Sequence, residues 1–154
     1  MIKMSIALGS DHRGFELKNR IINFLKSSGY EYVDFGCNSA DAVDYPDFAS
    51  DVARCIIKGQ ADYGILICAS GIGMSITANK YNGIRAAICC NPELAVRARR
   101  HNDANVLCLG SDFVDEPTAI DITRNFLTTA FEGGRHQRRL DKISKIESVL
   151  LDNK

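Results

Sequence analysis

The sequence lacks net charge, long apolar runs and Cys-x-x-Cys pairs. Its 19 Lys and Arg residues balance 19 Asp and Glu residues, so no overall field attracts nucleic acid or an anionic membrane. No apolar run approaches the roughly 20 residues that a bilayer-spanning helix needs. Six cysteines are present without a Cys-x-x-Cys pair, which argues against a zinc ribbon or a thioredoxin-type centre. Reduced thiols in a cytoplasmic protein are the simplest interpretation.

The chain has the size and composition of one globular domain. It contains 154 residues, of which 45% are hydrophobic and 25% charged, and these values are ordinary for a soluble domain with a sizeable core. No internal repeat or linker divides the chain, so residues 1–154 are predicted to form a single domain. With no metal-ligand spacing and only three histidines, we expect no metal and no cofactor.

Five strand-like stretches alternate with helical ones. The strands are expected at 5–8, 32–35, 65–67, 85–89 and 105–109, and the helices at 15–28, 48–58, 74–80, 92–101, 116–130 and 135–151. This alternation predicts an α/β, Rossmann-like, doubly wound domain with a mostly parallel sheet and helices on both faces. We expect the strand order 2-1-3-4-5 and an extra C-terminal helix. Ligands of such sheets bind at the carboxyl ends of the strands, here between strands one and three.

The stretch from Tyr63 to Lys80 is the most informative part of the chain. An apolar run typical of a buried strand ends at Cys68, and the small residues 69–73 lead into a helix. Such a turn directs free backbone N–H groups at one point, where an anion or an oxyanion can bind. A tight turn that needs glycine only for its backbone is the alternative. Cys68 could likewise be a small buried hydrophobe, although thiols before a helix N-terminus are often activated.

Other polar residues carry similar alternatives. Asp11 and His12 follow the first strand and could form a helix cap and a surface imidazole, or part of the site. His101 and Asn102 end a helix rich in arginine, where positive charge complements the helix dipole. Arg135 and the residue four positions later, Arg139, share one helical face. That face is either solvated or suited to gripping one phosphate.

The motifs together resemble the B-type ribose-5-phosphate isomerases, a family that also contains galactose-6-phosphate and allose-6-phosphate isomerases. The resemblance covers nearly the whole chain. The matching segments are Gly9-Ser10-Asp11-His12, Asp44-Tyr45-Pro46, Ile67-Cys68, Ser70-Gly71-Ile72-Gly73, Ala78-Asn79-Lys80, Gly83-Ile84-Arg85-Ala86, Arg100-His101-Asn102-Asp103, Asn105-Val106-Leu107 and Glu132-Gly133-Gly134-Arg135-His136.

The resemblance implies a reaction and a role for each residue. Ribose 5-phosphate and ribulose 5-phosphate would interconvert through a cis-enediolate in the non-oxidative pentose phosphate pathway. Cys68 would be the base, Ser70 and His101 would open the ring, and Asp11 would take part in catalysis by binding hydroxyls and shuttling protons. The backbone N–H groups of Gly71, Ile72, Gly73, Met74 and Ser75 would hold the enediolate oxygen; His12, Arg135 and Arg139 would hold the phosphate; Tyr45 and Asn102 would line the site. The resemblance also implies a homodimer, sometimes paired into a tetramer, in which the second subunit supplies His101 and Asn102.

The sequence departs from the family pattern at several positions. Ala69 and Ser70 replace a common Gly-Thr, and Ser70 keeps the hydroxyl. Met74 stands where a subgroup without the cysteine has a glutamate base, which leaves Cys68 as the base. Asp112 occupies a position where many relatives have an arginine near the phosphate, and an acid pointing inward would repel that phosphate. Arg13 could compensate for it.

Three other functions are compatible with parts of the pattern. An isomerase of a six-carbon sugar phosphate, either allose 6-phosphate or galactose 6-phosphate, would share every motif. A cysteine phosphatase would need an arginine six residues after its nucleophile, where the sequence has Met74. A non-catalytic nucleotide-binding module would leave Cys68 incidental, and the chain has neither Gly-x-Gly-x-x-Gly nor a Gly-Lys-Ser/Thr loop.

Overall fold

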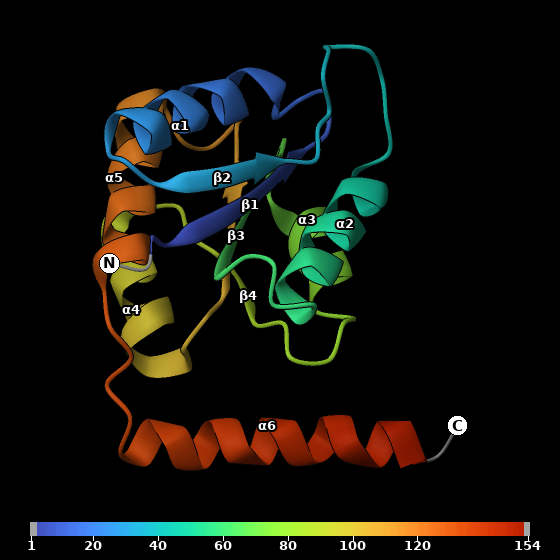
Figure 1. Ribbon diagram of the computed structural model, residues 1–154, viewed down its shortest axis with the longest axis vertical. Helices are drawn as coiled ribbons and strands as arrows, with labels where there is room; N and C mark the ends of the chain where they lie inside the picture. Colours follow the sequence, from blue (N-terminus) through green and yellow to red (C-terminus); the bar gives the residue numbers. More distant parts are fainter. Residues whose placement is uncertain (1–2, 153–154) are drawn as a thin grey trace.

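A parallel sheet of five strands forms the centre of the molecule (Figure 1). The structure, a computed structural model, describes residues 3–152; the predicted domain also includes residues 1–2 and 153–154, which lie outside this range. The strands are β1 (Ser5–Ser10), β2 (Glu31–Asp34), β3 (Tyr63–Cys68), β4 (Ala86–Ile88) and β5 (Val106–Gly110). The predicted α/β class and all five predicted strands are confirmed.

The order of the strands is β2-β1-β3-β5-β4, so the predicted order 2-1-3-4-5 is wrong in its last two strands. The two strands differ in length and burial. All five residues of β5 are buried, whereas β4 has three residues, none of them buried. The longer apolar strand therefore takes the inner position and the short one the edge. The topological switch point between the parallel strands β1 and β3, which positions the crevice, is the same in both orders.

Helices cover both faces of the sheet (Figure 1). On one face, α1 (Phe15–Ser27), α4 (Pro92–Asn102) and α5 (Glu116–Thr128) pack on a core that includes Ile65 and Leu107. On the other, α2 (Tyr45–Ile57) and α3 (Ile72–Ala78) pack on a core that includes Leu66 and Met74. Because alternate residues of β3 face opposite layers, its continuous apolar run is buried on both sides.

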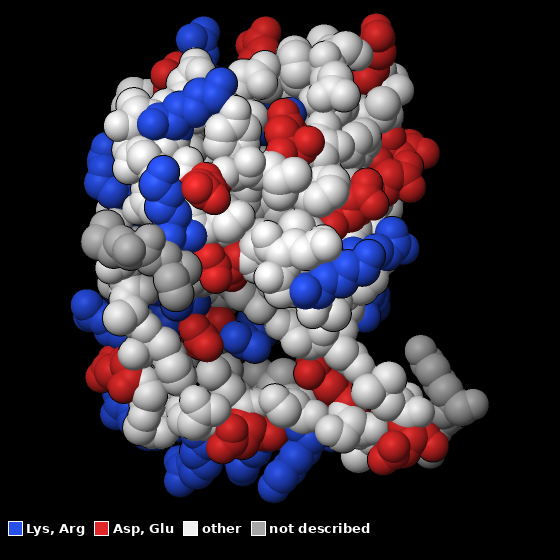
Figure 2. All heavy atoms as spheres, viewed as in Figure 1, with Lys and Arg blue, Asp and Glu red and all other residues white. Residues whose placement is uncertain are grey.

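The last helix, α6 (Arg135–Asp152), lies apart from these layers. Only His136 and Leu140 of this helix are buried. A groove of about 650 Å³ separates α6 from β4 and α4, and Figure 2 shows the hollow between the helix and the body. Apolar side chains remain exposed along the helix: Ile143, Ile146, Val149, Leu150 and Leu151. The apolar stripe of this amphipathic helix is therefore only partly covered by the rest of the described chain.

Charges of both signs are interspersed over the face that Figure 2 shows, in keeping with the balanced composition. Within residues 3–152, no helix combines the length and the apolar character that crossing a membrane requires.

Candidate active site

The ends of β1 and β3 lie side by side at the carboxyl edge of the sheet. Ser10 pairs with Ile67 in the register of the two strands, and the Asp11 N–H donates to the Ile67 carbonyl at 3.2 Å. Asp11 therefore leaves the sheet next to Cys68, the last residue of β3. The predicted meeting of these two chain segments at the crevice is confirmed.

Cys68 lies at the floor of this crevice. Its side chain is among the buried ones, with the residue 5% exposed, and its Sγ accepts a hydrogen bond from the Gly71 N–H at 3.1 Å. The N–H places a partial positive charge beside the sulfur. Gly71 has a φ of 79°, and a Cβ there would come within 3.2 Å of the Leu109 carbonyl carbon. Glycine is thus required both for the left-handed turn and for the close approach of β5.

The amides that follow Gly71 differ in their availability. The Ile72 N–H donates to the Ser70 Oγ at 3.2 Å, and the Ser75 N–H donates to the Gly71 carbonyl at 3.0 Å. Between them, the N–H groups of Gly73 and Met74 have no acceptor within residues 3–152. The candidate oxyanion site therefore narrows from the five predicted amides to these two. Because the Met74 side chain is fully buried in the core under α2, only its backbone is available to a ligand.

Tyr45 borders the same loop. A Cβ added at Gly73 would lie 2.5 Å from the Tyr45 Cζ, so the ring rests directly on the glycine. Tyr45 is the first residue of α2, and Pro46 follows it within the first turn, where the fixed φ of proline suits a helix start. Tyr45, which the sequence predicts to line the site, therefore lies beside the Cys68 loop.

Asp11 and His12 sit at the opposite wall of the crevice. The Asp11 Oδ1 accepts from the Arg13 N–H at 3.0 Å and from the Gly14 N–H at 3.1 Å, so the carboxylate orders the turn before α1. Its other oxygen is left for a ligand hydroxyl. The His12 Nδ1 accepts from the Val43 N–H at 3.3 Å, which leaves Nε2 as the nitrogen able to donate.

The remaining predicted site residues lie near the amino ends of the strands, at the opposite end of the sheet from Cys68. His101 and Asn102 end α4, which runs back from the carboxyl edge to the amino edge. Arg99, two residues before His101, donates from Nη2 to the hydroxyl of Tyr63 at 2.8 Å, and Tyr63 is the first residue of β3. Cys68, at the far end of β3, is thus separated from this region by the length of the strand, roughly 17–20 Å.

Arg135 and Arg139 belong to the same remote region, because α6 begins beside the end of α4. The His101 and His136 rings are stacked with their centroids 4.5 Å apart and their planes at 13°. The Glu132 N–H donates to the Arg100 carbonyl at 3.0 Å, which fixes the loop before α6 on α4. One chain therefore brings together Cys68, Ser70, Asp11, His12 and Tyr45, and it holds His101, Asn102, Arg135 and Arg139 elsewhere.

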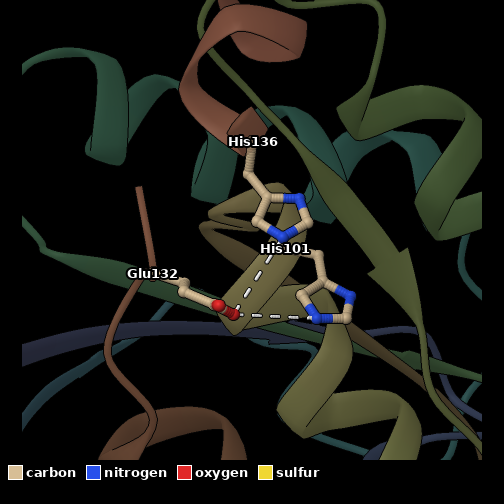
Figure 3. Close-up of side chains that lie close together, drawn as sticks. All are labelled: His101, Glu132 and His136. Atoms are coloured by element: carbon tan, nitrogen blue, oxygen red, sulfur yellow. Dashed lines mark ion pairs between the residues drawn. The ribbon is translucent and has the colours of Figure 1, made fainter. Parts of the chain in front are cut away.

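Glu132 and His136 join His101 in a compact group (Figure 3). The Glu132 Oε2 lies 3.9 Å from the His101 Nε2 and 4.0 Å from the His136 Nε2. Burial lowers the pKa of His136, and His101 and Arg135 add to the effect. The sequence alone predicts no role for Glu132 or His136. The four-residue spacing of Glu132 and His136 was visible in the sequence, but the proximity of His101 depends on tertiary structure.

The departure at Asp112 has a structural explanation. The Arg13 Nη2 contacts both carboxylate oxygens of Asp112 at 3.0 Å. The acid is therefore paired with an arginine that the chain supplies, and its charge is largely compensated. This ion pair is exposed, so it contributes only about 0–1 kcal/mol to the stability of the fold. Its main effect is to offset the negative charge of Asp112.

The chain is similar along most of its length to known isomerases. A family profile described as Ribose/Galactose Isomerase matches residues 6–143. The ribose-5-phosphate isomerase B of Escherichia coli strain K12 is 47% identical over 142 residues, 92% of this chain and 95% of the relative. The solved ribose-5-phosphate isomerase B of Clostridium thermocellum is 49% identical with a TM-score of 0.94, covering 96% of this chain and 99% of the other. That of Mycoplasma genitalium with bound ribulose-5-phosphate is 45% identical with a TM-score of 0.91, and the coverage is again 96% and 99%.

Proposed function

The chain belongs to the ribose/galactose isomerase family, and from this premise we propose that it interconverts D-ribose 5-phosphate and D-ribulose 5-phosphate. The observation that carries the proposal is the Cys68 loop: a thiol at the end of β3, with an N–H directed at its sulfur and the free amides of Gly73 and Met74 just beyond. The bound ribulose-5-phosphate of the Mycoplasma genitalium relative supports the five-carbon substrate. Nothing in the site favours the nucleotide-binding alternative.

The reaction needs a base, an oxyanion site and a means to open the sugar ring. After ring opening, the Cys68 thiolate removes the C2 proton of ribose 5-phosphate, and the electron pair of that C–H bond forms the enediolate. The Gly73 and Met74 amides stabilise the negative charge on its oxygen. A proton then passes from O2 to O1 of the enediolate, and protonation at C1 by the Cys68 thiol gives ribulose 5-phosphate and restores the thiolate. Ser70 and His101 move protons during ring opening, and Asp11 holds sugar hydroxyls.

A second copy of the chain completes the site in this proposal. The strand length between Cys68 and His101 prevents one chain from placing both on one sugar. In a two-fold dimer, each crevice receives His101, Asn102, Arg135 and Arg139 from the partner. The exposed apolar side chains of Ile143, Ile146 and Leu150, which line the groove beside α6, support such a contact. His12 of the crevice, whose Nδ1 accepts from the Val43 N–H, then holds the phosphate together with the partner's Arg135 and Arg139.

A cytoplasmic location accords with six free cysteines.

The sugar preference is tested by a coupled assay of the purified protein. Ribose 5-phosphate, allose 6-phosphate and galactose 6-phosphate are compared under identical conditions, and kcat/KM is measured for each. We expect the highest value for ribose 5-phosphate. Preference for either six-carbon sugar would replace the proposed substrate while leaving the chemistry intact, and inactivity on all three would remove the isomerase proposal.

Removing the phosphate contact of Arg135 should weaken ground-state binding. We expect Arg135→Ala to raise KM for ribose 5-phosphate roughly 10- to 100-fold, the worth of one charge-assisted hydrogen bond. The matched control is Arg138→Ala, which removes an equal charge from an exposed neighbouring position of α6 and should change KM little. An equal rise in KM for the two substitutions would mean that Arg135 acts only through its contribution to the overall positive charge of α6.

The buried thiols of Cys89 and Cys108 should not react with an alkylating reagent. Burial raises the pKa of Cys89 to about 12 and raises that of Cys108 well above its usual range, so near pH 7.5 their thiolate fraction is on the order of 10⁻⁴ or less. We expect iodoacetamide to modify the exposed Cys90 at once and Cys68 more slowly, with ribose 5-phosphate protecting Cys68 alone. Peptide mass spectrometry measures this, and protection of Cys90 instead would place the sugar elsewhere.

A further inference from the structure

Lys18 is a charged side chain that the fold buries almost completely. It belongs to α1, and only 1% of its side chain is exposed. Its Nζ donates to both carboxylate oxygens of Asp34, the last residue of β2, at 2.6 and 2.7 Å. Lysine is almost never buried to this extent unless it is paired. Because the desolvation of two charges offsets much of their attraction, a buried ion pair is weak evidence for stability. The role of this pair is better sought in the geometry that it fixes.

The Asp34 carboxylate also holds the segment that follows β2. Its Oδ1 accepts from the Gly36 N–H at 2.9 Å. The register between β1 and β2 ends at Asp34, but hydrogen bonds between the two segments continue beyond it. The Ser10 N–H donates to the Gly36 carbonyl at 2.7 Å, and the Cys37 N–H donates to the Ser10 carbonyl at 2.8 Å. The segment that Asp34 orders therefore clamps the last residue of β1, directly before Asp11.

The turn that follows Asp11 is tied to the same lysine. The Lys18 N–H donates to the Gly14 carbonyl at 2.9 Å, and the Gly14 N–H donates to the Asp11 Oδ1 at 3.1 Å. A Cβ at Gly14 would lie 2.4 Å from the Ile67 carbonyl oxygen, so this turn packs directly on the end of β3. The ion pair thus joins the two chain segments that hold Asp11 in place, the turn before α1 and residues 34–37.

We propose, as an inference that rests on the proposed function, that Lys18 is a positioning residue for the isomerase reaction. Lys18 itself touches no substrate. Through Asp34 and Gly36 it holds the end of β1, and it thereby sets the position from which the Asp11 carboxylate meets the sugar hydroxyls. A displacement of about 1 Å in such a group can lower a rate roughly 100-fold, so the ion pair affects turnover as well as the fold.

Hydrogen exchange tests the clamp without reference to activity. Lys18→Met keeps most of the length of the buried side chain and removes its charge. Amide exchange followed by NMR should be at least about tenfold faster at Ser10 and Cys37 in this variant. The matched control is Lys26→Met, which removes an exposed lysine from the last turn of the same helix and should leave both amides unchanged. Parent-like exchange at both amides in Lys18→Met would overturn the clamp.

A double-mutant cycle with Asp11→Asn separates positioning from a general effect on the fold. Lys18→Met should lower kcat/KM for ribose 5-phosphate roughly 10- to 100-fold in the parent. In the Asp11→Asn background the same substitution should cost less than about threefold, because the carboxylate that Lys18 positions is already gone. Equal losses in the two backgrounds would leave Lys18 with a structural role and overturn the proposal.

The double variant Lys18→Met/Asp34→Leu decides the case in which Lys18→Met does not fold. It contains no unpaired buried charge, so its thermal stability should stay near that of the parent, while kcat/KM falls as in the single variant. Unfolding of the double variant, or a stable double variant with the kcat/KM of the parent, would overturn the positioning role. A parent protein inactive on ribose 5-phosphate would instead remove the proposed function, and the exchange rates would still report whether the ion pair holds the end of β1.

Discussion

Cys68→Ala should lower kcat by roughly 10²–10⁴, the usual contribution of a general base. The thiol is the only group at the end of β3 that can remove a carbon-bound proton in this proposal, and Met74, where some relatives have a glutamate base, has its side chain buried in the core. KM should change little, because the phosphate and hydroxyl contacts remain. Stopped or continuous assays of ribulose 5-phosphate formation give both constants.

The matched control for this substitution is Cys90→Ala, which removes an exposed thiol from the loop after β4 and should retain full activity. Cys68→Ala shortens a small side chain of a residue that is 5% exposed at the crevice floor. Circular dichroism then verifies that the variant is folded. A Cys68→Ala enzyme within tenfold of the parent would remove the thiol from the mechanism.

The fold could be predicted because its signals are local. Four of the five strands are short, mainly apolar runs, and β2 is the exception. The helices begin and end at prolines, glycines and capping residues within a few positions of their predicted bounds. The order of β4 and β5 was the exception. Strand order depends on which strand gains more free energy when both of its faces are buried. The periodicity of apolar residues along the chain does not indicate this difference. Comparing Ala86–Ile88 with the wholly buried Val106–Gly110 indicates the answer once the structure is known.

The candidate site likewise has features that the sequence predicts and features that depend on tertiary structure. The Cys68 loop was predictable, since the thiol, the glycines and the next helix are adjacent in sequence. Which amides remain free was not, because Ser70 Oγ and Cys68 Sγ occupy two of them through side-chain geometry. The ion pair between Arg13 and Asp112 joins residues 99 positions apart. The stacking of His101 on His136 likewise depends on where α6 begins relative to α4, and no local pattern records it.

The central claim is that each active site combines residues of two chains. Cys68 lies at the carboxyl end of β3, and His101 lies in the last turn of α4, near the amino ends of the strands. A site that needs both residues must therefore take them from different copies of the chain. Cys68→Ala and His101→Ala proteins should each be nearly inactive alone. In a mixed dimer of the two, one site carries both lesions and the other carries neither.

The decisive measurement is the activity of the two variants refolded together in equal amounts, with mixed dimers quantified by native mass spectrometry. Random pairing makes half the dimers mixed, and half of the sites in those dimers are intact. We therefore expect recovery to roughly a quarter of the parent activity, if the sites act independently. If Cys68 and His101 instead served a site within one chain, every site would keep a lesion, and activity near zero despite confirmed mixed dimers would contradict the shared site.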